Sequence, residues 1–173
     1  TVTDVARVFP DRKRNDGRYY AIDFTLGELK TLRVNERIDH ATGLRVFPGR
    51  FPAGKSQFEV PTLAEEIELV QGLNRSTGKQ VAIYTEIKRP AWHRRQGKDI
   101  SRIVLNALAE HGYRGGEDAC LVQCFDAAET RRLREELGCQ LPLVQLIAGN
   151  DWGEAATDFD ALRTPQGLRK IAE

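Results

Sequence analysis

The stretch V81-A-I-Y-T-E-I-K-R-P90 begins as an apolar, β-branched run and ends in charged residues directly before a proline. Side chains along a β-strand alternate between its two faces. Tyr84, Glu86 and Lys88 therefore share one face of the predicted strand, while its isoleucines share the other. Such a strand places a carboxylate and an ammonium group side by side at its carboxyl end.

The sequence around this strand alternates between helical and strand-like patterns. In chain order we expect a helix at 62–73, the strand at 81–88, a helix at 99–111, a strand at 119–125, a helix at 127–137, a strand at 141–148 and a helix from 164. Alternation of this kind, with nearly continuous apolar strands, indicates a parallel sheet covered by helices. The predicted fold class is α/β, either a doubly wound sheet or a portion of a (β/α)8 TIM barrel.

One feature of the sequence favours the barrel over the doubly wound sheet, and another limits how much of a barrel this chain can contain. No G-x-G-x-x-G pattern follows a predicted strand, so a dinucleotide-binding sheet lacks support. A full barrel takes about 250 residues and eight strands, of which only about three or four are recognisable here. We therefore expect a single partial barrel domain over residues 1–173, with the barrel incomplete in this chain.

Residues 10–60 show weak periodicity and are expected to form a loop-rich insertion within that domain. Residues 24–32 are predicted to form a short helix, with Thr25 as its N-cap and Glu28 completing a capping box. Residues 47–55 combine prolines and glycines and indicate a long loop. In the later helix at 99–111, we expect the apolar residues Ile100, Ile103, Val104, Ala107 and Leu108 to face inward.

Composition excludes several classes of protein. The 173 residues are 40% hydrophobic and 29% charged, which is ordinary for a globular domain. The net charge of +1 gives no global reason to expect nucleic acid as a partner. No apolar run approaches the roughly 20 residues of a membrane span. The cysteines, Cys120, Cys124 and Cys139, form no C-x-x-C pair, and small buried hydrophobes are the favoured interpretation for the first two.

The charged end of the 81–88 strand has two interpretations. Glu86 and Lys88 could be a neighbour pair reaching solvent, or Glu86 could bind a hard cation while Lys88 faces an anion such as phosphate. Gln123 and Gln145 add polar groups near the ends of the next two strands. Each glutamine alone is more typical of a core residue bonded to backbone, but three strands ending alike favour a site at the carboxyl ends.

A set of short motifs in a fixed order then points to a family. T3-D-V5, F24-T-L-G-E-L-K-T-L32, V60-P-T-L-A-E-E66, Y84-T-E-I-K-R-P90 and L121-V-Q-C-F-D126 together resemble the glycerophosphodiester phosphodiesterases. The stretches R18-Y-Y-A-I-D-F24 and F47-P-G-R-F-P-A-G-K55 are similar to the bacterial periplasmic type. The resemblance runs along essentially the whole chain.

The resemblance implies a (β/α)8 hydrolase that converts glycerophosphodiesters to an alcohol and glycerol 3-phosphate. It implies a divalent cation, Ca²⁺ or Mg²⁺, with Glu86 as one of three carboxylate ligands and Lys88 facing the phosphate. Phe125 would line the glycerol side of the pocket beside Gln123, and Trp152 its mouth. A periplasmic location and a small-molecule substrate are further expectations.

One part of the family pattern has no match here. The two catalytic histidines of the family lie in H-R-G and H-D motifs, and those motifs and the other metal carboxylates precede the segment that T1-V-T-D-V5 resembles. His40 in a turn, His93 in the polar W92-H-R-R95 loop and His111 at a helix end are not expected to replace them. The last two barrel strands are also expected to lie beyond Glu173. We therefore expect a central portion of the enzyme, inactive by itself.

Two alternatives remain at this point. A non-catalytic binding or interaction module could derive from the same barrel and never have carried the acid–base pair. A different (β/α)8 enzyme acting on phosphates is less well supported, because no glycine-rich phosphate loop occurs in the chain.

Overall fold

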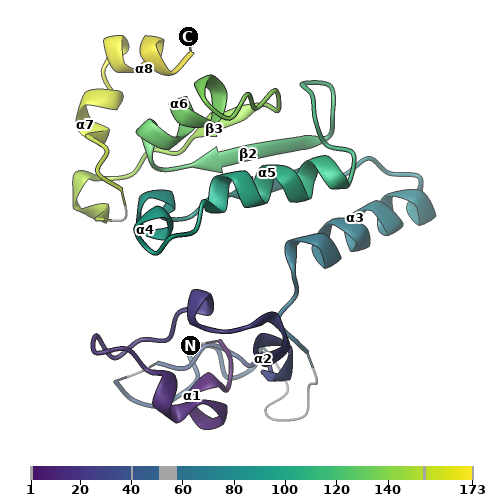
Figure 1. The fold of residues 1–173 in the computed structure, drawn as a ribbon, viewed down its shortest axis with the longest axis vertical. Helices are drawn as coiled ribbons and strands as arrows, with labels where there is room; N and C mark the ends of the chain where they lie inside the picture. Colours follow the sequence, from purple (N-terminus) through teal and green to yellow (C-terminus); the bar gives the residue numbers. More distant parts are fainter. Residues whose placement is uncertain (1, 40, 51–57, 154, 173) are drawn as a thin grey trace. The chain divides into compact units, whose positions relative to one another are not determined.

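The structure is a computed structural model that describes residues 2–39, 41–50, 58–153 and 155–172. The chain divides into two compact units, Thr1–Thr62 and Leu63–Glu173 (Figure 1). The region predicted as an insertion lies within the first unit, and the predicted α/β alternation occupies the second.

Short helices and connecting segments build the first unit. Its elements are α1 (Val5–Val8), the 3-10 turns η1 (Pro10–Arg12) and η2 (Ala21–Asp23), and α2 (Leu26–Thr31). Antiparallel bridges join Thr3 to Val34 and Ile38 to Arg45. The predicted capping box is confirmed, since Thr25 Oγ1 accepts from the Glu28 amide and Glu28 bonds back to the Thr25 amide. Residues 51–57 of the predicted long loop lie outside the described residues.

A parallel sheet organises the second unit. Its strands are β1 (Ile83–Glu86), β2 (Cys120–Cys124) and β3 (Leu143–Gln145), in the order β1-β2-β3. Both pairings are parallel, with Glu86 opposite Gln123 and Cys124 opposite Gln145. The prediction of a parallel α/β arrangement is confirmed, although each strand is shorter than its apolar run.

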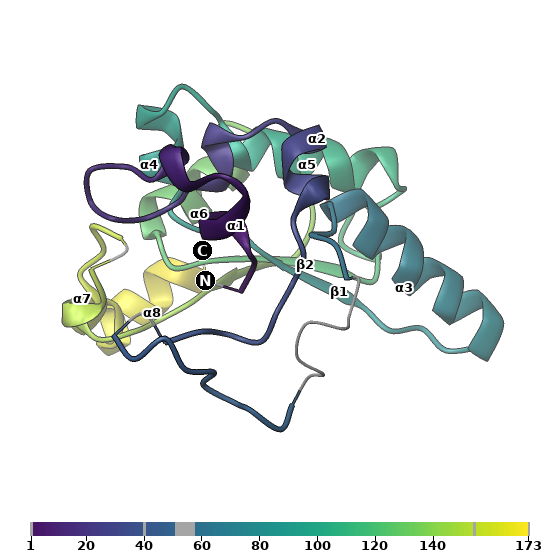
Figure 2. The ribbon, with the colours of Figure 1, turned by 90° about the horizontal axis from the view of Figure 1, so that it is seen from below.

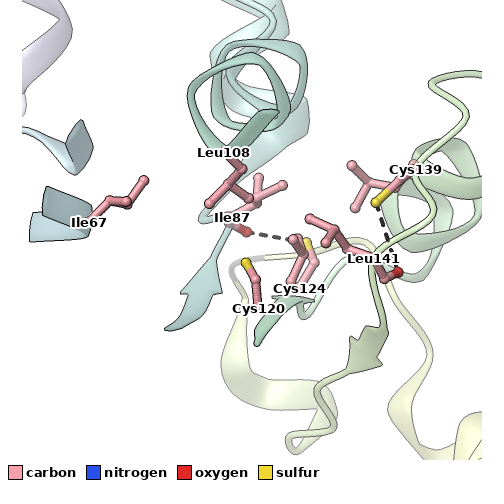
Figure 3. Close-up of a cluster of buried hydrophobic side chains, with 9 residues drawn as sticks. Ile67, Ile87, Leu108, Cys120, Cys124, Cys139 and Leu141 are labelled. Carbon is pink, nitrogen blue, oxygen red and sulfur yellow. Dashed lines mark hydrogen bonds between the residues drawn. The ribbon is translucent and has the colours of Figure 1, made fainter. Parts of the chain in front are cut away.

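The core lies between the sheet and the helices α3 (Leu63–Thr77), α5 (Ile100–Glu110) and α6 (Ala127–Glu135). Helices α5 and α6 lie above the strands in Figure 2. Figure 3 shows the buried cluster, which consists of Ile67, Ile87, Leu108, Cys120, Val122, Cys124, Leu133, Cys139 and Leu141. All three cysteines are free and buried, so the interpretation of Cys120 and Cys124 as small buried hydrophobes is confirmed.

Short helical elements follow β3 in the chain. The turn η3 (Asn150–Trp152) leads to α7 (Phe159–Leu162) and α8 (Pro165–Ala172). The proline at the first position of α8 suits a helix start, as predicted. Gly167 is buried against α7, where an added Cβ would lie 2.2 Å from the Ala161 carbonyl oxygen. Only glycine permits this close approach of the two backbones.

Three details of the predicted elements were wrong. Helix α3 continues through Gly72 to Thr77, because an interior glycine costs a helix only about 1 kcal/mol. The segment expected as a polar loop around His93 is helix α4 (Pro90–Arg95), whose proline occupies the first turn. Ile103 is 56% exposed rather than inward, and the buried face of α5 instead includes Ser101.

A buried carboxylate explains why Ser101 takes that place. Glu129 on α6 is completely buried, and its Oε1 accepts hydrogen bonds from Ser101 Oγ at 2.6 Å and Arg132 Nη1 at 2.8 Å. Arg94 on α4 donates to Oε2 of the same carboxylate. Arg132 also pairs with Asp99, the N-cap of α5, at 2.6 Å. This network joins α4, α5 and α6, and the sequence analysis did not identify it.

We expect Glu129→Ala to lower the free energy of unfolding by about 3 kcal/mol, because it leaves the buried Ser101 hydroxyl without its acceptor and removes the buried carboxylate that Arg94 and Arg132 share. Urea unfolding of the full-length protein measures the loss. Glu136→Ala is the control: Glu136 also pairs with Arg132, at 3.3 Å, but its side chain is 68% exposed. Such a surface pair contributes about 0–1 kcal/mol. Equal losses in the two variants would contradict the role given to the buried network.

Candidate active site

The carboxyl ends of β1 and β2 meet at a small cavity. The residues that line it are Glu86, Ile87, Lys88, Arg89, Pro90, Cys124, Phe125, Asp126 and Ala155. Parallel strands present their carboxyl ends at one edge of a sheet, and α/β proteins place their sites there. The predicted pair Glu86 and Lys88 and the predicted substrate residue Phe125 all lie at this edge.

Glu86 and Lys88 form an ion pair of limited strength. Lys88 Nζ lies 3.4 Å from Glu86 Oε1, and the lysine side chain is 61% exposed while that of the glutamate is 25% exposed. A pair with one partner in solvent is worth about 0–1 kcal/mol. The neighbour-pair arrangement is therefore present, but it holds the carboxylate only weakly.

The Glu86 carboxylate has an unsatisfied oxygen. Its Oε1 is buried, and no described residue donates a hydrogen bond to it. The Lys88 ammonium lies near this oxygen but does not have the geometry of a hydrogen bond. A buried acceptor without a donor is costly. A hard cation is one partner that would satisfy a carboxylate oxygen, so the chemistry of Glu86 fits a cation ligand.

The turn after Lys88 has an unusual backbone. Arg89 has φ +48°, the only positive φ of a non-glycine residue in the described part of the chain. The following Pro90 disfavours the right-handed helical region at Arg89 and is itself buried. The Arg89 guanidinium lies 5.6 Å from the centre of the Trp92 ring. Strained residues of this kind persist where the surrounding contacts hold them, so the turn from β1 into α4 is well defined.

The two glutamines of the predicted site lie on opposite faces of the sheet. Gln123 is opposite Glu86 in the β1–β2 register and therefore shares its face. Gln145 is opposite Cys124 and faces the helices, where Thr130 Oγ1 donates to it at 2.5 Å and its own amide donates to the Phe125 carbonyl oxygen at 3.0 Å. The suggestion that Gln145 belongs to the site with Gln123 was wrong; Gln145 is a core glutamine.

Aromatic rings gather beside the end of β2. The Phe125 ring lies 5.5 Å from that of Trp152 and 6.2 Å from that of Phe159, between ring centres. Phe159 is buried, whereas Trp152 is 47% exposed. The cluster thus presents an apolar surface with Phe125 next to the cavity and Trp152 at its open side.

Asp126 holds the turn after β2 and is the N-cap of α6, a role that the sequence analysis did not identify. Its carboxylate accepts from the Ala128 amide at 3.1 Å and begins α6. Thr157 Oγ1 holds the same turn, since it accepts from the Ala127 amide and donates to the Phe125 carbonyl oxygen. The preference of aspartate for the N-cap position was the signal in the sequence that could have identified this role.

His93 and His111 are not among the residues that line the cavity. His93 is on α4 with its ring edge-on to Trp92, and its pKa is lowered by burial and then by the charge of Arg89. His111 is the C-cap residue of α5, with Nδ1 2.7 Å from the Ala107 carbonyl oxygen. His40 lies outside the described residues.

In the described part of the chain, two carboxylates line this cavity, Glu86 and Asp126. Asp126 accepts from the Ala128 amide as the N-cap of α6, so Glu86 is the better candidate for a metal ligand. Among the described residues, no three or more His, Cys, Asp or Glu side chains are grouped so that they could hold a metal ion. None of the helices in the same residues is long and apolar enough to cross a membrane.

The parallel sheet brings an acidic and a basic side chain to the carboxyl end of one strand, which is the edge where α/β enzymes build their sites. The chain belongs to the glycerophosphoryl diester phosphodiesterase family, whose model matches residues 2–173. It is 48% identical to a protein of Haemophilus influenzae named glycerophosphodiester phosphodiesterase, over 88% of this chain and 44% of that protein. A Treponema pallidum protein of the same name is 36% identical, over 99% of this chain and 53% of that protein. The chain spans about half the length of these relatives.

The contrast between the two glutamines can be tested. Gln145→Leu is expected to lower the free energy of unfolding by about 1–3 kcal/mol, because it leaves the Phe125 carbonyl oxygen and Thr130 hydroxyl without this partner. Gln123→Leu is the matched control, and we expect a change within about 1 kcal/mol, since Gln123 lies on the other face. Denaturant unfolding of the full-length variants measures both. A larger loss for Gln123→Leu would contradict the assignment.

Proposed function

We propose that the full-length protein hydrolyses glycerophosphodiesters to an alcohol and glycerol 3-phosphate. Membership of the family and the names of the relatives support the reaction. The observation that carries it to this chain is the Glu86–Lys88 pair at the carboxyl end of β1, with a buried carboxylate oxygen that lacks a donor among the described residues.

We propose the fold of the full-length protein to be a (β/α)8 barrel. The three parallel strands, each followed by a helix, support this, since β1 leads to α4 and α5, β2 to α6, and β3 to α7 and α8. On the same proposal, the second unit is a section of the barrel and residues 10–60 are an insertion in it. The barrel would close with parts of the full-length protein outside this chain.

In this proposal Glu86 is a ligand of a divalent cation, Ca²⁺ or Mg²⁺. Its carboxylate fits because oxygen ligands suit both ions and because one of its oxygens is buried and accepts no hydrogen bond from any described residue. The cation would polarise a phosphate oxygen of the substrate. Among the described residues, Asp126 is the other carboxylate that lines the cavity, and it caps α6, so further ligands would come from elsewhere in the full-length protein.

Lys88 would hold and stabilise the phosphate. Its ammonium group is 61% exposed at the open edge of the sheet, on the same face as Glu86, and can move toward an anion at small cost. A cation aimed at the charge that develops on the phosphate is a large contribution to catalysis, of the order of 10²–10³ in rate for one such group.

Gln123, Phe125 and Trp152 would contact the glycerol part of the substrate. Gln123 lies beside Glu86 in the sheet and carries both hydrogen-bond donors and an acceptor for hydroxyl groups. The Phe125–Trp152 rings offer a surface for the carbon chain. On the resemblance to the periplasmic type, we further propose a periplasmic location.

A non-catalytic binding module is the alternative. The observation that favours it is that the cavity lining named above contains no histidine, so proton transfer would depend on groups elsewhere in the full-length protein. Such a module would bind a glycerophosphodiester without cleaving it.

The test is a coupled assay of glycerol 3-phosphate release by the full-length protein at limiting cation. We expect Glu86→Gln to raise the cation concentration needed for half-maximal activity, because one anionic ligand becomes neutral. Lys88→Met is expected to lower kcat/KM by about 10²–10³, with partial recovery in Lys88→Arg.

Glu136→Gln and Lys98→Met are matched controls with exposed side chains and should retain the native rates. Native activity in Glu86→Gln at limiting cation would refute its role as a ligand. Binding of the diester without any turnover would support the non-catalytic alternative.

A further inference from the structure

Cys124 lies where the three strands end. Its carbonyl oxygen accepts from the Leu146 amide after β3 at 2.9 Å. Its thiol donates to the Ile87 carbonyl oxygen after β1 at 3.2 Å, and its sulfur accepts from the Asp126 amide after β2 at 3.3 Å. Cys124 thus forms hydrogen bonds with backbone groups just after the end of each of the three strands. Figure 3 shows the bond to Ile87.

The thiol takes the place of a backbone donor. The parallel ladder between β1 and β2 ends with the bond from the Ile87 amide to the Gln123 carbonyl oxygen at 2.9 Å. Beyond that point the Ile87 carbonyl oxygen accepts a hydrogen bond from the Cys124 thiol. Both backbone groups of Ile87 are therefore held: its amide by the ladder, and its carbonyl oxygen, which belongs to the Ile87–Lys88 peptide, by the thiol.

The environment keeps the thiol in its donor form. Cys124 is 1% exposed, and burial raises its pKa to about 12. It therefore stays protonated at neutral pH and retains the hydrogen that it donates to Ile87. The same burial makes it a poor nucleophile, which leaves holding the strand ends as its chemical role.

We propose that Cys124 is a positioning residue that holds the Ile87–Lys88 peptide and thereby sets where Glu86 and Lys88 stand at the cavity. Both side chains extend from backbone adjacent to that peptide. A shift of about 1 Å in a group that contacts the substrate can cost about a hundredfold in rate. The inference rests on the proposed function for its consequence in catalysis, while the positioning itself is a property of the backbone.

Cys120 provides a matched control. It lies in the same strand, faces the same helices and is completely buried. Its thiol makes no hydrogen bond to any described residue, in contrast to the thiol of Cys124. Truncation to alanine removes a sulfur atom from the core at either position, but only at 124 does it release the Ile87 carbonyl oxygen.

The experiment compares alanine and serine variants at both positions in the full-length protein. We expect Cys124→Ala to lower kcat/KM roughly ten- to a hundredfold and Cys124→Ser to recover most of the loss, because its hydroxyl can donate to Ile87. Cys120→Ala is expected to retain native kinetics even where it unfolds at lower urea. Equal kinetics in the two alanine variants, or no recovery with serine, would overturn the inference.

Crystal structures of the two alanine variants give an answer independent of activity. The inference predicts a displaced Ile87–Lys88 peptide in Cys124→Ala and an unchanged one in Cys120→Ala. An unmoved peptide in Cys124→Ala overturns it. Absence of turnover in the native protein would instead refute the proposed function and leave the structural comparison to decide the positioning.

Discussion

The burial of one carboxylate at the end of a parallel strand is the constraint on which the site depends. Glu86 closes β1, and the register with β2 places it beside Gln123. A buried carboxylate oxygen needs a partner, and the Lys88 ammonium supplies only a weak, solvent-exposed one. The geometry therefore leaves Glu86 available to a cation and Lys88 available to an anion, which is the pairing on which the proposed function rests.

The rest of the second unit holds that strand end in place. Cys124 joins the ends of the three strands, and the buried Glu129 network joins the helices α4, α5 and α6 behind them. Helix α4 begins directly after Lys88 and Arg89, so a network that holds α4 also restrains the turn at the site. The hydrogen bonds of the core therefore also restrain the residues at the cavity.

Sequence patterns predicted what depends on local chemistry. The parallel sheet followed from alternating periodicity, and the cap at Thr25 follows from local hydrogen bonding of its side chain. Local misses were the end of α3, helix α4 and the N-cap at Asp126, whereas two further errors concern contacts between distant segments. Ser101 is buried because Glu129 needs a donor, and Gln145 faces the helices because of the register with Cys124. Neither partner can be identified from spacing along the chain. The roles of Glu86, Lys88, Gln123, Phe125 and Trp152 came from the family resemblance and remain predictions.

The most direct test of the central claim is to locate the ion. Anomalous diffraction from crystals of the full-length protein grown with Mn²⁺ or Ca²⁺ would show where the cation binds. The account predicts an ion in contact with a Glu86 carboxylate oxygen, about 2.3–2.6 Å away for calcium. An ion bound elsewhere, with the Glu86–Lys88 pair unchanged, would contradict it.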